Sequence, residues 1–132
     1  MAYHKAGHVV VGKLVGENAL PSSREYINNH IKIALGGRAA EELLYNDINK
    51  VTTMAHSDLK IVTDLVYDSI EKYGFTDVGK LVVSDRMSDA TRAHIDREAY
   101  RVMDMAYTEV IENLKINWSD VVDTAHLLME TI

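Results

Sequence analysis

The sequence predicts an all-α fold, a compact and mainly α-helical bundle of about five helices. Apolar residues recur three and four positions apart in successive segments, which is the spacing of one helix face. The one convincing extended run, Leu81-Val82-Val83, is too short to found a sheet. With 132 residues, 47% of them hydrophobic, the chain can bury one substantial core. No repeat or composition shift divides it, so we expect residues 1–132 to form a single domain.

The N-terminal part of the chain predicts two helices. The first covers residues 2 to 14 or 15, and residues 16–21 break it. Ser22 and Glu25 have the spacing of a capping box, in which a serine and an acid three positions later bind each other's free amides. A second helix is therefore expected from this point to residue 44 or 45.

A pair of glycines, Gly36-Gly37, lies inside the second predicted helix. Each glycine costs about 1 kcal/mol relative to alanine in a helix interior, so the pair needs a reason. We interpret it as a site of close helix packing, and a turn at the two glycines is the alternative.

A third helix is expected after the polar connector at residues 46–53, with Gly74 as its stop signal. Its predicted inward stripe consists of Leu59, Val62, Val66 and Ile70, widened by Ile61 and Leu65. Residues 75–86 are expected to form an ordered loop.

Two further helices are expected in the C-terminal part. Ser88-Asp89 starts a long helix that runs through about Ile116, and Asn117 or Ser119 caps a last one that ends near Glu130. The residues of the long helix predicted to face inward are Ile95, Val102, Met105, Ala106, Val110 and Leu114.

Composition excludes several classes of function. The formal charge of −6, with lysines and arginines scattered along the chain, gives no electrostatic footprint for nucleic acid. The absence of cysteine excludes a disulfide framework and a thiolate metal site, so any metal must be held by histidines and carboxylates. No apolar run approaches the roughly 20 residues of a membrane span, and we expect a soluble chain.

Two histidines near the N-terminus, His4 and His8, predict a zinc-binding helix. Residues four apart lie on the same helix face, so both imidazoles can reach one ion at about 2.0–2.1 Å. In zinc peptidases of the H-E-x-x-H type, the residue after the first histidine is a glutamate that acts as general base. Lys5 holds that position here, so the two metal-binding histidines of the pattern are present and its general base is missing.

A catalytic zinc site normally has three protein ligands, and Asp58 is the candidate for the third. It lies in the first turn of the third predicted helix, where its carboxylate can face the first helix. The alternative is an acid stabilised only by the helix dipole, worth up to about 1 kcal/mol. His56 is a rival ligand. The histidines expected merely to face solvent or to pack are His30, His94 and His126.

Several motifs, in order along the chain, carry a family resemblance. They are His-x-Ala-Gly-His at residues 4–8, Gly-Gly-Arg-Ala-Ala-Glu-Glu-Leu-Leu-Tyr at residues 36–45, and Ser57-Asp58-Leu59 opening a helix that ends at Tyr73-Gly74. Phe75, Met87-Ser88-Asp89 and the closing Met129-Glu130-Thr131-Ile132 extend the likeness. Over nearly its whole length the chain closely resembles the peptidase domain of the FtsH family of ATP-dependent zinc proteases.

This resemblance implies a set of site residues. His4 and His8 match the family's zinc-binding histidines, and Asp58 matches its third zinc ligand. Glu41 matches a family glutamate close to the metal, to which we assign the orientation of an imidazole. An acid on the helix surface is the alternative for Glu41.

The resemblance also implies partners and a location. Family members have a membrane anchor and an ATPase module, form hexameric rings, and degrade membrane and misfolded soluble proteins. Protein or peptide substrates, a homo-oligomer and a place on the cytoplasmic side are therefore expected. We recognise neither the anchor nor the ATPase module in these 132 residues.

Two departures from the family pattern bear on activity. Lys5 replaces the catalytic glutamate, and loss of a general base typically lowers the rate by about 10²–10⁴. A lysine with a strongly lowered pKa could serve as base instead. In addition, the stretch between His8 and Gly36 is shorter than usual, so the strand edge that pairs with an extended substrate is expected to be shortened or lost.

Three hypotheses follow from these observations. The chain is an FtsH-type zinc metallopeptidase domain disabled by Lys5, a catalytically dead pseudoprotease that acts as an assembly or adaptor module, or a helical domain in which His4 and His8 merely pack.

Overall fold

The computed structural model describes residues 2–80 and 82–130. The helices are α1 (Ala2–Val15), α2 (Arg24–Tyr45), α3 (His56–Glu71), α4 (Asp89–Ile116) and α5 (Trp118–Glu130), with short 3₁₀ helices η1 (Ile48–Lys50) and η2 (Thr53–Ala55) between α2 and α3. No strand occurs in the described residues, which confirms the predicted all-α bundle. Leu81 of the extended run and the closing Thr131-Ile132 lie outside the described residues. None of the described helices combines the length and apolarity that a bilayer crossing requires.

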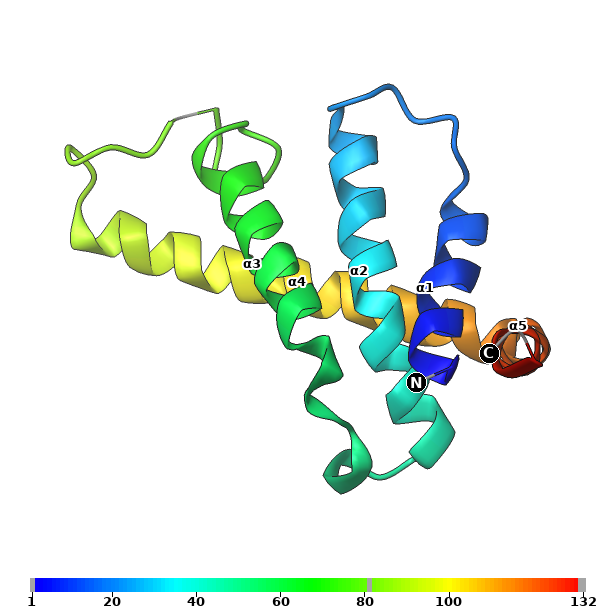
Figure 1. Cartoon of the computed structure of the whole chain (residues 1–132). Helices are drawn as coiled ribbons and strands as arrows, with labels where there is room; N and C mark the ends of the chain where they lie inside the picture. Colours follow the sequence, from blue (N-terminus) through cyan, green and yellow to red (C-terminus); the bar gives the residue numbers. More distant parts are fainter. Residues whose placement is uncertain (1, 81, 131–132) are drawn as a thin grey trace.

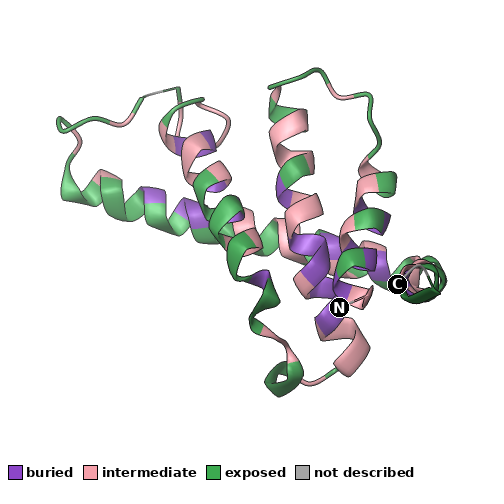
Figure 2. Ribbon diagram, in the orientation of Figure 1, coloured by how far each residue is buried: buried purple, intermediate pink, exposed green. Residues whose placement is uncertain are grey.

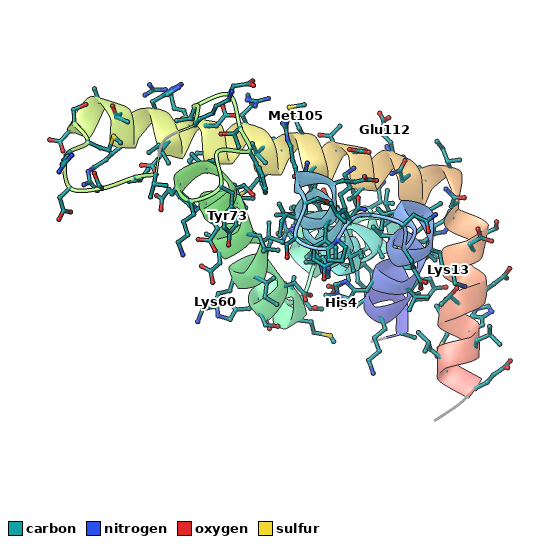
Figure 3. All side chains as sticks on the ribbon, turned by 90° about the horizontal axis from the view of Figure 1, so that it is seen from above. His4, Lys13, Lys60, Tyr73, Met105 and Glu112 are labelled. Atoms are coloured by element: carbon teal, nitrogen blue, oxygen red, sulfur yellow. The ribbon has the colours of Figure 1, made fainter. Side chains whose placement is uncertain are left out.

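The helix α2 occupies the centre of the bundle. It packs against α1 on one side and α3 on the other, and α4 crosses behind all three (Figure 1). After α4 the chain bends and α5 packs against α1, so that α4 and α5 together form an L when seen from above (Figure 3). The N-terminal helix α1 thus lies between α2 and the C-terminal helix α5.

The core lies where these helices meet. In Figure 2 many of the buried residues, drawn in purple, lie along the facing sides of α1 and α2. The predicted stripe of α3 is correct for Val62, Val66 and Ile70, each at most 1% exposed. Ile61 and Met105 were wrongly predicted to face inward, since they are 52% and 60% exposed. Each lies one position before a residue that does face the core, and one position turns the side chain about 100° around the helix. Figure 3 shows Met105 on the outer side of α4.

The start of α2 differs from the predicted capping box. Ser23, not Ser22, is the N-cap, and its hydroxyl accepts a hydrogen bond from the Tyr26 amide at 3.1 Å. Ser22 has a φ of 64° because the chain turns there, and the Ser23 amide donates to the Leu20 carbonyl at 3.0 Å. The turn places Ser23 in the extended conformation that an N-cap needs. Glu25 therefore lies one position too early for a capping box.

Two other helix ends follow the sequence signals, and the start of α5 does not. Ser88 caps α4 by accepting from the Thr91 amide at 3.2 Å. The predicted cap of α5 at Asn117 or Ser119 is wrong: the Asn117 side-chain amide donates to the Asn113 carbonyl of α4 at 2.8 Å, and only its backbone carbonyl accepts from the Asp120 amide at 3.0 Å. At Gly74 the backbone takes a φ of 62°, and the chain leaves α3.

The glycine pair of α2 is helical, and Gly36 lies against Gly7 of α1. A Cβ at Gly7 would lie 2.1 Å from the Gly36 carbonyl oxygen, and one at Gly36 would lie 2.7 Å from the Gly7 carbonyl oxygen. Neither position therefore accepts a side chain without a shift of the helices. The interpretation as close packing is confirmed. This contact fixes the position of α1 along the axis of α2, and thus which residues of the two helices face each other.

Candidate metal centre

The structure brings His4, His8 and Asp58 together, although Asp58 lies 50 residues beyond His8. His4 Nε2 and His8 Nε2 are 3.1 Å apart, and they lie 2.9 and 3.1 Å from Asp58 Oδ2. One possible ligand atom from each of the three residues falls within 4.8 Å of the other two. His4 is buried, whereas the side chains of His8 and Asp58 are 26% and 21% exposed. The cluster is thus buried at His4, which Figure 3 labels, and partly accessible to solvent at His8 and Asp58.

The other nitrogen of each imidazole is held by an acceptor. His8 Nδ1 lies 2.7 Å from the Ile33 carbonyl oxygen in α2, and His4 Nδ1 lies 2.8 Å from Glu41 Oε2. Because a carbonyl oxygen and a carboxylate only accept, we place a proton on each Nδ1. In the neutral form of both rings, each Nε2 then presents a lone pair toward Asp58.

Glu41 supports this arrangement from inside α2. Its side chain is fully buried, so it does not lie on the helix surface. Besides His4, its carboxylate binds Thr52: Oε1 accepts from the Thr52 amide at 3.2 Å and from the Thr52 hydroxyl at 2.5 Å. Burial raises the pKa of Glu41, but the hydrogen bonds from Thr52 and His4 outweigh burial and hold that pKa below its usual range. The carboxylate therefore remains an ionised acceptor.

Gly37 provides the room for the two imidazoles. A Cβ at this position would lie 2.5 Å from His4 Nε2 and 2.6 Å from His8 Nε2. The second glycine of the pair thus has a different use from the first: Gly36 admits the backbone of α1, and Gly37 admits the two rings.

The donor set fits a zinc ion. Two neutral imidazole nitrogens and a carboxylate oxygen are ordinary zinc ligands, and three ligands at about 2.0–2.1 Å from one tetrahedral ion lie roughly 3.3 Å from one another. The separations here, 2.9 to 3.1 Å, are close to that value. Without a cation or an added proton, three electron pairs would face one another, which is unfavourable.

The remaining candidate residues lie apart from this cluster. Lys5 is exposed, and among the described residues it forms no ion pair. His56 is exposed at the first position of α3 and does not belong to the three-residue cluster. The other three histidines, His30, His94 and His126, are exposed as expected.

Two site residues, Thr52 and Gly37, were not assigned from the sequence. Thr52 lies in a polar connector, where a threonine carries no signal of a buried partner 11 residues earlier. Gly37 was recognised as a packing glycine, but the identity of the groups packed on it depends on how α1 docks.

The family model and the similar proteins all indicate the same family. A family model described as "Peptidase family M41" matches residues 14–132. The chain is 29% identical to the ATP-dependent zinc metalloprotease FtsH 3 of Synechocystis sp., with 98% of the chain and 28% of that protein covered. It is 28% identical to FtsH 2 of Thermoanaerobacter sp., over 98% of the chain and 29% of that protein. It is also 29% identical to the chloroplastic FTSH 1 of Arabidopsis thaliana, over 98% of the chain and 24% of that protein.

These comparisons also show a difference in length. The chain spans less than a third of the curated relatives it matches. The aligned stretches cover 174 and 153 residues in the first two comparisons, more than the 132 residues of this chain. Those relatives therefore contain residues, inside the matched region, that have no counterpart here.

Proposed function

The chain belongs to peptidase family M41, and from this premise we propose that it is a zinc-binding peptidase domain whose hydrolytic activity is strongly reduced. One observation carries the proposal: His4 Nε2, His8 Nε2 and Asp58 Oδ2 converge while both Nδ1 atoms are occupied by acceptors. We assign the zinc to these three atoms, and the whole of residues 1–132 to one peptidase-like domain. When bound in such a site, zinc supplies Lewis acidity toward a peptide carbonyl and activates water.

The chain's own residues hold and orient the ligands. Glu41 and the Ile33 carbonyl each keep a proton on Nδ1 of one imidazole, and this leaves Nε2 free to coordinate. The missing function is proton removal from the attacking water. Lys5 offers an ammonium instead of a carboxylate, and its exposed position agrees with repulsion from a divalent cation. We therefore expect a rate about 10²–10⁴ below that of a chain with the glutamate.

Substrates and partners follow from the relatives. We propose unfolded proteins or peptides as substrates, because the named relatives are proteases. Their ATP dependence belongs to those longer proteins, and assembly of this chain into a ring is an expectation of the same kind. Residues 16–23, between α1 and α2, contain no strand, so an extended substrate has no edge to pair with there.

The test is to restore the base. In Lys5→Glu we expect cleavage of an unfolded casein-type substrate to rise at least 100-fold, because the carboxylate supplies the missing proton acceptor. Lys5→Gln is the matched control, since it removes the positive charge without adding a base, and its rate should stay close to that of the parent.

Zinc content is measured on the same proteins. The parent chain should bind about one zinc, as a three-ligand site requires, and His8→Ala should lose it. Equal zinc binding by the parent and His8→Ala would contradict the assignment. If Lys5→Glu binds zinc and still does not cleave, the alternative function, a catalytically dead assembly or adaptor module, is favoured. The absence of a strand in residues 16–23 is the observation in favour of that alternative.

A further inference from the structure

The connector between α2 and α3 contains a threonine whose hydroxyl makes two hydrogen bonds close to the metal centre. Thr52 precedes η2, which continues directly into α3. The hydrogen bonds described for Thr52 involve none of the three proposed zinc ligands. Its side chain contacts Glu41 on one side and the Met54 amide on the other.

The first contact acts on His4 through Glu41. A fully buried carboxylate is unfavourable unless hydrogen bonds replace its water. Glu41 Oε2 accepts from His4, and Oε1 accepts from the hydroxyl and the amide of Thr52. Two of the three described hydrogen bonds to this carboxylate therefore come from Thr52. They fix the plane of the carboxylate, and with it the direction in which Oε2 meets His4 Nδ1.

The second contact acts on Asp58 through the backbone. The Thr52 hydroxyl has one proton, which goes to Glu41, so toward the Met54 amide it acts as acceptor at 3.3 Å. This bond makes Thr52 the N-cap of η2. Because η2 leads without a break into α3, the cap helps to set where the first turn of α3, and thus Asp58, begins.

We propose that Thr52 is the positioning residue of the metal centre: its hydroxyl orients His4 through Glu41 and Asp58 through η2. This inference rests on the proposed zinc site. It makes the connector, which has no metal ligand, a determinant of zinc affinity.

The test uses three variants of neighbouring threonines. Thr52→Val keeps the shape and removes the hydroxyl, Thr52→Ser keeps the hydroxyl, and Thr53→Val changes an adjacent, exposed threonine. Zinc affinity is measured by competition with a chelator. We expect Thr52→Val to bind zinc about 10- to 100-fold more weakly, as removal of a group that orients a ligand typically does. Thr52→Ser and Thr53→Val should stay within about threefold of the parent. Unchanged affinity in Thr52→Val would overturn the proposal.

A second readout does not need the metal. Nitrogen NMR of the metal-free protein reports which nitrogen of His4 carries the proton. In the parent and in Thr52→Ser, Nδ1 of His4 should keep its proton, whether or not Nε2 also carries one, because Glu41 accepts it. In Thr52→Val, part of the His4 population should lack the proton on Nδ1. If the parent does not bind zinc, the proposed zinc site is wrong. Separately, full protonation of His4 Nδ1 in Thr52→Val, as in the parent, would overturn the positioning role of Thr52.

Should Thr52→Val fail to fold, the parent itself decides. A hydroxyl proton bound to a buried carboxylate exchanges slowly with water, so NMR should detect the Thr52 hydroxyl proton close to the Glu41 side-chain methylenes. Fast exchange of that proton in the folded parent would overturn the proposal.

Discussion

Helix α2 makes two contacts of opposite kind, one with α1 and one with α4. Against α1 the glycines Gly7 and Gly36 bring the two backbones together, and no side chain fits between them. Against α4 the helices leave a cleft of about 310 Å³, lined also by the loop after α3. We call this second region the α2–α4 cleft. Lys32 of α2 and Glu109 of α4 form an ion pair at 3.0 Å beside it.

The difference shows where this fold needs precision. The α1–α2 contact fixes the position of His4 and His8 relative to Ile33 and Glu41, and the Nδ1 atom of each histidine has an acceptor there. The α2–α4 cleft holds a buried hydroxyl, Thr76 Oγ1, with no hydrogen-bond partner among the described residues. The tight contact positions the proposed metal ligands, and the looser one mainly buries apolar surface. Substitutions should therefore have large effects at the first contact and small ones at the second.

The strongest way to break the tight contact is Gly7→Ala. The new Cβ would lie 2.1 Å from the Gly36 carbonyl oxygen, which is backbone and cannot move aside. We expect the free energy of unfolding to fall by about 3 kcal/mol, at the upper end for overpacking, despite the better helix propensity of alanine. Urea unfolding followed by circular dichroism measures it.

Gly12→Ala is the matched control on the same helix. A Cβ at Gly12 meets nothing within 4 Å, so here alanine should raise stability by up to about 1 kcal/mol. A similar loss in both variants would mean that the α1–α2 contact is not as close as the structure indicates.

A smaller and more selective effect is expected from Gly37→Ala. Its Cβ would lie within 2.6 Å of both Nε2 atoms, so the imidazoles must turn away from Asp58. We expect zinc affinity to fall by at least 10-fold, which corresponds to about 1.4 kcal/mol, with little change in the stability of the metal-free protein. Chelator competition and urea unfolding on the same sample separate the two. Parent-like zinc affinity in this variant would show that the rings do not pack on Gly37.

The smallest effect is expected in the α2–α4 cleft, from Thr76→Val. Replacing an unpartnered buried hydroxyl by a methyl group of the same shape removes a desolvation cost, and we expect a gain of about 1 kcal/mol. Thr76→Ser, which keeps the hydroxyl and loses the methyl, should be less stable than the parent. A loss of stability in Thr76→Val would indicate that the hydroxyl does have a partner, such as an ordered water.

Local signals in the sequence predicted the helices well because these signals depend on near neighbours. The apolar spacing of α3, the cap at Ser88 and the glycine after α3 each involve residues a few positions apart. The errors were also local. Ser22 was predicted as the cap of α2 where Ser23 is the cap, and Ile61 and Met105 each lie one position before a residue that faces the core. One position is enough to turn a side chain from the core to solvent.

The sequence by itself determined that His4 and His8 share a helix face, that Lys5 stands between them without a carboxylate, and that no cysteine can take part in a metal site. Tertiary structure alone decided that Glu41 is buried against His4, that Gly37 lies under both imidazoles, and that Thr52 connects Glu41 to η2. The physical reason is distance along the chain. Contacts between α1, α2 and the connector join residues far apart in sequence, and they depend on how the helices dock, which helical periodicity does not encode.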